Sequence, residues 1–125
     1  MNYMFLRARE EFQRDLMFRS LDRIGPVDLS KYEVIYAGEC ADDGQDQVIL
    51  EGLFQTFNIA HPEDFRAASM SVGDIVMLGN ARLWFCDSVG WVALTGENAP
   101  VAYSRVTLYE ASRPARAAAN RRAGR

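Results

Sequence analysis

The sequence has no hydrophobic run long enough to cross a membrane. The chain has 125 residues and is 49% hydrophobic, but it contains no stretch of about 18 apolar residues, the length that a transmembrane helix needs. The N-terminal segment also lacks the apolar core of a signal peptide, because Arg7, Arg9 and Glu10 interrupt it. We therefore expect a protein that is not exported and that acts in the cytoplasm.

Cysteine and histidine are scarce, which argues against metal sites and against most nucleophilic catalysis. Cys40 and Cys86 lie far apart in the chain and match no metal-ligand spacing. A cytoplasmic protein keeps such thiols reduced, so we expect two free cysteines. His61 is the only histidine, hence the only candidate general base, and local spacing assembles no Ser-His-Asp or Cys-His group around it. We expect no catalytic residues and no cofactor.

Lysine and arginine are absent from residues 32–65, a stretch that holds eight carboxylates. A field of one sign repels nucleic acid and attracts a basic partner surface. The alternative is an ordinary solvated acidic face. Six of these carboxylates are the candidate partner-binding residues, namely Glu33, Glu39, Asp42, Asp43, Asp46 and Glu51.

The turn around Asp42, Asp43 and Asp46 resembles the start of a calcium-binding loop. Such a loop requires a glutamate at its twelfth position. When the count starts at Asp42, that position is Leu53, which cannot bind a cation. The sequence therefore predicts no metal site here.

The C-terminal residues 113–125 carry five arginines and no acid. Without them the chain has nine basic and seventeen acidic residues, so a body of charge −8 precedes a tail of charge +5. The tail is either a short helix or a disordered segment. Its candidate nucleic-acid-binding residues are Arg113, Arg116, Arg121 and Arg122. The acidic body opposes this interpretation, because phosphate contacts dominate nucleic-acid affinity.

Hydrophobic periodicity predicts an α+β fold. Helical spacing of apolar residues predicts helices over residues 3–24 and 46–57, and Pro62 suits the first position of a short helical turn. Alternating or short apolar runs predict strands at residues 32–40, 75–78, 83–87, 91–94 and 101–109. We expect a mostly antiparallel sheet of four to five strands packed by two helices. Residues 1–112 would form this single domain, followed by the basic tail.

A succession of short motifs resembles the YodL-like domain family. The motifs are LEGLF (50–54), FN (57–58), PEDF (62–65), SMSVGDIV (69–76) and FCDSVGW (85–91). The resemblance covers residues 32–94, and it places the N-terminal helix and the tail outside. Gly73 stands where the family usually has serine, and Trp91 where it usually has phenylalanine; both are compatible with the same turns.

The resemblance implies a small protein of bacterial mobile elements or phages, and it supplies no catalytic residues. The shared serines and aspartates precede strands, where such side chains close turns by bonding to the backbone. We therefore expect them to be structural.

Three functions fit the sequence, in decreasing order. The first is a non-enzymatic protein-binding module, such as an inhibitor of a host defence system in the manner of anti-CRISPR proteins, whose acidic surface occupies a basic partner. The second is a nucleic-acid-binding accessory protein that uses the arginine tail. The third is an enzyme with a site around His61, which would need other reactive groups to converge on the imidazole.

Overall fold

The fold is built on one antiparallel sheet of five strands in the order β2-β1-β3-β4-β5. We analysed a computed structural model that describes residues 1–42, 44–79, 81–101, 108 and 110–123. The strands are β1 (Asn2–Ala8), β2 (Tyr32–Glu39), β3 (Ile75–Leu78), β4 (Arg82–Cys86) and β5 (Trp91–Ala93). The predicted α+β class and antiparallel sheet are confirmed.

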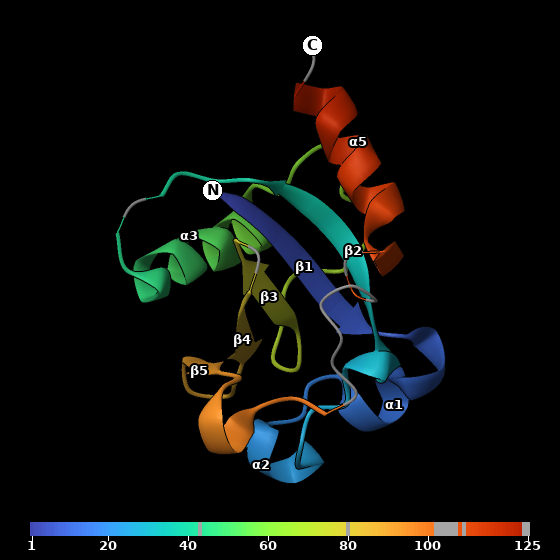
Figure 1. Cartoon of the computed structure of the whole chain (residues 1–125), viewed down its shortest axis with the longest axis vertical. Helices are drawn as coiled ribbons and strands as arrows, with labels where there is room; N and C mark the ends of the chain where they lie inside the picture. Colours follow the sequence, from blue (N-terminus) through green and yellow to red (C-terminus); the bar gives the residue numbers. More distant parts are fainter. Residues whose placement is uncertain (43, 80, 102–107, 109, 124–125) are drawn as a thin grey trace.

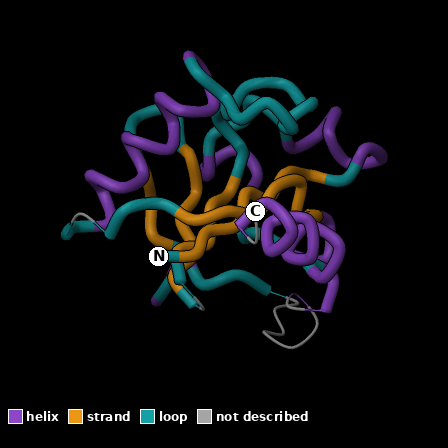
Figure 2. The backbone as a smooth tube through the Cα atoms, turned by 90° about the horizontal axis from the view of Figure 1, so that it is seen from above, coloured by secondary structure: helices purple, strands orange, loops and turns teal. Residues whose placement is uncertain are grey.

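Helices lie on both sides of this sheet. The long ones are α3 (Asp46–Ile59) and α5 (Arg113–Ala123), and the short ones are α1 (Gln13–Leu16) and α2 (Leu21–Ile24). Three 3-10 turns, η1 (Glu10–Phe12), η2 (Leu29–Lys31) and η3 (Gly96–Asn98), complete the described elements. Figure 1 shows α3 on one side of the strands, α1 and α2 at the opposite end, and α5 beside β2. In the view from above, α5 is seen nearly end-on, away from α3 (Figure 2).

The sheet separates two hydrophobic clusters. On one face, α3 contributes Leu50, Leu53 and Phe57, which pack over strand residues such as Tyr3 and Phe5. On the other face, buried strand residues are covered by the connections that contain α1 and α2 and by the alanines of α5. Burial of apolar surface on both faces provides the main stabilisation of such a layered fold.

The N-terminal helix predicted over residues 3–24 is wrong. Residues 2–8 form β1, the strand between β2 and β3, and six of its seven residues are buried. A strand covered on both faces shows a continuous apolar run in place of alternation, and a short run of this kind is easily mistaken for a buried helix. Between residues 10 and 24 only η1, α1 and α2 form, each one turn long.

The other predicted elements have mixed outcomes. The helix over 46–57 is confirmed, as are the four strands between residues 32 and 94. Pro62 begins a hydrogen-bonded turn, closed by the Phe65 N–H on its carbonyl at 3.0 Å, and no helix. Most of the strand predicted over 101–109 lies outside the described residues; Val101 forms an isolated bridge with Asp28, and Leu108 is helical.

The tail alternative that the structure supports is the helix, because α5 spans residues 113–123 and contacts β2. Within the described part of the chain, no helix is both long enough and apolar enough to cross a membrane.

Candidate functional site

The predicted partner-binding residues do not all gather in one place. Glu39 ends β2, Asp42 lies in the following connection, and Glu51 lies on α3; all three are exposed. Glu33 stands near the other end of β2, about 20 Å from Glu39 at the usual rise of a strand. Its carboxylate is 3.7 Å from Arg9. Asp43 lies outside the described residues. The acidic surface of the described chain is therefore formed by Glu39, Asp42 and Glu51.

Asp46 belongs to this stretch but has a structural role. Its carboxylate accepts hydrogen bonds from Arg82 Nε at 2.8 Å and Nη2 at 3.2 Å, and from Trp84 Nε1 at 3.0 Å. The Arg82 guanidinium, aided by the Trp84 indole, lowers the pKa of Asp46. These bonds fasten the first turn of α3 to β4, so Asp46 is already occupied. Arg82 also attracts the nearby Asp42.

The candidate catalytic groups are not arranged for catalysis. The His61 side chain is exposed, with Nδ1 2.9 Å from the carbonyl oxygen of Pro62 and the ring 5.9 Å from that of Phe65. These contacts belong to the turn. Burial raises the pKa of the Cys86 thiol to about 12, so the thiol stays protonated at neutral pH. Cys40 and Cys86 are both free thiols, as predicted.

The hollows and acidic groups of the described residues do not form a metal centre. No group of three or more His, Cys, Asp or Glu side chains in this part of the chain is placed to hold a metal ion. An open hollow beside α2 is lined partly by Asp22, Asp87 and Glu97. Asp87 is committed to the backbone there, because its Oδ1 accepts the N–H groups of Leu21 at 3.1 Å and Ser88 at 2.8 Å.

The tail arginines face several directions and do not form one free basic surface. Arg113 pairs with Glu110, and Arg116 Nε donates to Ser112 Oγ at 2.8 Å. Arg121 is exposed. Arg122 turns back onto the body of the protein. Nucleic-acid binding by the four predicted residues would therefore require several of these contacts to break.

Arg122 occupies a defined site next to the edge of the sheet. Its Nη1 lies 2.6 Å from Oδ2 of Asp64, its Nη2 donates to the carbonyl oxygen of Ala37, and its guanidinium carbon is 4.6 Å from the centre of the Tyr36 ring. Desolvation opposes ionisation of Asp64, but Tyr36 and Arg122 outweigh it and lower the pKa of this carboxyl. Sequence reasoning counted Asp64 only as one more acid.

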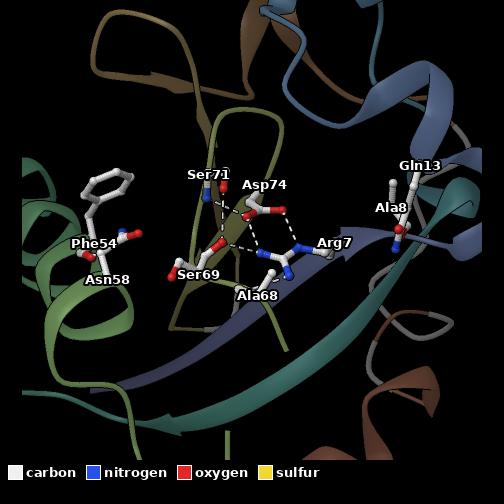
Figure 3. A network of polar contacts seen from close by, with 9 residues as sticks. All are labelled: Arg7, Ala8, Gln13, Phe54, Asn58, Ala68, Ser69, Ser71 and Asp74. Atoms are coloured by element: carbon white, nitrogen blue, oxygen red, sulfur yellow. Dashed lines mark hydrogen bonds and ion pairs between the residues drawn. The ribbon is translucent and has the colours of Figure 1, made fainter. Parts of the chain in front are cut away.

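A buried ion pair links the first strand to the loop before β3, and Figure 3 shows its contacts. Arg7 Nε and Nη2 donate to the two carboxylate oxygens of Asp74 at 2.9 and 2.8 Å. The remaining donors reach the carbonyl oxygens of Ala68 at 3.0 Å and Ser69 at 2.9 Å. The Ser71 N–H donates to Asp74 at 2.8 Å. Burial raises the pKa of Asp74, and Arg7 and Ser71 oppose that rise.

This cluster explains the Ser-x-Ser-x-x-Asp motif as structural, in agreement with the expected role of its Asp74. The sequence analysis missed Arg7, although a signal exists: a lone arginine inside the apolar run of residues 3–8 has to find a buried partner.

Gly73 lies inside the same motif, and replacing it by the serine usual in the family should destabilise this chain. Its φ is +99°, and a Cβ atom would lie 2.8 Å from the carbonyl oxygen of Leu16. The expectation that glycine and serine are interchangeable here is therefore wrong. For Gly73→Ser we expect a loss of about 1–3 kcal/mol in the free energy of unfolding, measured by urea denaturation.

Gly90 provides the matched control. Its φ is also positive, at +72°, but no atom lies within 4 Å of its hypothetical Cβ. Gly90→Ser therefore carries the cost of the backbone conformation without the clash. A Gly73→Ser variant no less stable than Gly90→Ser would refute the close contact with Leu16.

The comparisons with known proteins agree with the motifs. The family model of the YodL-like domain matches residues 2–95. The match extends beyond the expected 32–94 and includes β1, because β1 lies between β2 and β3 in the sheet. It ends before α5. Neither the search of curated proteins nor that of solved structures gives a match. Since the model covers most of its length, the chain belongs to the YodL-like domain family.

Proposed function

We propose that this chain is a non-enzymatic protein-binding module of a bacterial mobile element or phage. In this proposal it acts in the cytoplasm as an inhibitor of a host defence complex, in the manner of anti-CRISPR proteins, and presents an acidic surface to a basic protein partner. The observation that carries the proposal is the exposure of Glu39, Asp42 and Glu51, which form no ion pair within the described residues.

Exposed, unpaired carboxylates favour such a role on physical grounds. They keep their full charge, so they raise the rate at which a basic partner approaches and orient it on contact. Asp46 and Glu33 contribute less, because Arg82 and Arg9 already compensate their charges. A partner whose natural ligand is nucleic acid suits this surface, since carboxylates can replace phosphates as hydrogen-bond acceptors.

The alternatives have less support. The tail arginines that would bind nucleic acid include Arg122 and Arg113, which are paired within the molecule. An enzyme around His61 would need a cleft and a second reactive group, whereas this imidazole is exposed and bonded to its own turn. Both ideas are ranked below a binding module for these reasons.

The experiment reverses two exposed charges, Asp42 and Glu51. Tagged wild type and the Asp42→Arg/Glu51→Arg variant are used to capture partners from a lysate of the native host, and the captured protein is then purified for affinity measurements. We expect the variant to bind at least about tenfold more weakly, the factor that corresponds to 1.4 kcal/mol. Asp46 is left intact, because its replacement would also detach α3 from β4.

The matched control is Glu10→Arg/Glu11→Arg, which makes the same change of charge at two exposed positions in η1. It should retain most of the affinity. Equal affinity of wild type and the Asp42/Glu51 variant would refute the acidic surface. Equal weakening by both variants would show that only net charge matters.

A further inference from the structure

The contacts of Arg122 are those that select a guanidinium over other cations. Asp64 provides a carboxylate 2.6 Å from Nη1, Ala37 provides a carbonyl oxygen for Nη2, and the Tyr36 ring lies 4.6 Å from the guanidinium carbon. A planar fork with several donors can satisfy two acceptors and stack on a ring at once, whereas the ammonium of lysine is a point charge. The three groups together form a site for an arginine side chain.

The site is held in place by contacts that do not involve Arg122. The Tyr36 hydroxyl donates to Oδ1 of Asp64 at 2.9 Å, which orients the carboxylate. The Tyr36 ring packs against Phe57 at 5.5 Å and Phe65 at 5.8 Å between ring centres. A preformed site of this kind binds its ligand without a large ordering cost.

The carbonyl of Ala37 is available because β2 is the edge strand of the described sheet. Met1 and Cys40 exchange hydrogen bonds across β1 and β2. In an antiparallel ladder the bonded pairs alternate, so Ala37, three positions from Cys40, directs its carbonyl away from β1. Open backbone groups on an edge strand are points where another chain can attach.

Arg122 reaches this site from a segment outside the family match, which ends at residue 95. The helix that carries it, α5, packs on the second hydrophobic cluster through Ala115 and Ala119. Alanine buries little apolar surface, so such a contact holds the helix weakly. The site belongs to the YodL-like unit, and its present ligand belongs to an appended helix that can be displaced.

We infer that Tyr36, Asp64 and the carbonyl of Ala37 form an arginine-recognition site for a protein partner, which Arg122 fills from within the same chain. A partner segment bearing an arginine binds there by replacing Arg122. The carboxylate of Asp64 excludes a phosphate ligand, so the partner is a protein and not a nucleic acid. The site is separate from the acidic surface proposed above and does not depend on it.

The test empties the site and offers it a small arginine probe. The full-length Arg122→Ala variant is titrated with Nα-acetyl-L-arginine amide, and backbone NMR signals are followed. We expect saturable shifts at Tyr36, Ala37 and Asp64 in the variant and none in wild type, whose site is filled. Nα-acetyl-L-lysine amide should bind more weakly. Arg122→Gln serves as a second emptied variant if Arg122→Ala does not fold.

Three further variants make the test specific. Arg121→Ala changes the neighbouring exposed arginine and should behave as wild type. Asp64→Asn in the Arg122→Ala background should weaken probe binding by about tenfold or more, since a hydrogen bond to a charged group contributes about 1.5–3 kcal/mol. Asp42→Arg/Glu51→Arg in that background should bind the probe unchanged, which separates this site from the acidic surface.

Several outcomes would overturn the inference. These are the absence of saturable shifts in the emptied variants, equal shifts in wild type, or equal binding of the lysine probe. Retained affinity after Asp64→Asn would also refute it, because the carboxylate is the strongest of the three proposed contacts.

Discussion

Replacing Asp74 by alanine is expected to lower the free energy of unfolding by about 3–5 kcal/mol, the usual cost of removing one partner of a buried ion pair. Arg7 stays behind with its side chain only 5% exposed. It loses two hydrogen bonds of 2.9 and 2.8 Å together with its counter-charge. The guanidinium cannot lose its proton, because its pKa lies above 12.

Two neighbouring groups make the loss harder to repair. The Ser71 N–H, which donates to Asp74 at 2.8 Å, loses its acceptor. The carbonyl oxygens of Ala68 and Ser69 still accept from Arg7, but neutral acceptors do not replace a carboxylate. The loop before β3 is therefore expected to loosen first, because Asp74 joins it to β1.

The measurement is urea denaturation followed by the fluorescence of the two tryptophans. The first control is Asp46→Ala, which breaks a pair whose arginine is 49% exposed and should cost about 1 kcal/mol. The second is Arg7→Met/Asp74→Leu, which removes both charges and should recover most of the stability, since apolar replacements of buried pairs are often tolerated. If Asp74→Ala costs no more than Asp46→Ala, the buried pair does not hold the loop.

The sequence predicted the fold best where a strand or helix has one exposed side. α3 shows helical spacing because one face packs on the sheet and the other faces solvent, with Val48 and Ile59 exposed. β1 gave no such contrast, because neighbours cover both of its faces, so periodicity suggested a helix. Local pattern reports local exposure, and the order of strands in the sheet depends on contacts between distant residues.

The candidate sites show the same limit. Counting charges located an acidic stretch, but the pairing of Asp46 with Arg82 spans 36 positions and has no local signature. The contact of Arg122 with Asp64 spans 58 positions. The sequence therefore identified which residues are charged, whereas the structure determines which charges remain available for a partner. Both long-range pairs reduce the acidic surface that charge counting suggested.

Replacing Phe57 by alanine should lower the free energy of unfolding by about 3–5 kcal/mol, the range observed when a large buried aromatic is truncated. Phe57 is fully buried on the inner face of α3. Its ring lies 4.8 Å from that of Phe65, 5.1 Å from that of Phe5 and 5.5 Å from that of Tyr36, with nearly perpendicular planes. Truncation leaves a cavity among rings that cannot all move inward at once.

Phe54 on the same helix provides the matched comparison, because its side chain is only partly buried. Phe54→Ala removes the same atoms and makes the same change in helix propensity, so the difference between the two variants measures the buried cluster. Phe57→Leu keeps much of the volume and should cost less than Phe57→Ala. Since Phe57 supports the Tyr36 ring, Phe57→Ala should also weaken the binding of the arginine probe in the Arg122→Ala background. Equal stabilities for Phe57→Ala and Phe54→Ala would show that α3 does not pack on the sheet through Phe57, and would remove the support on which the arginine site depends.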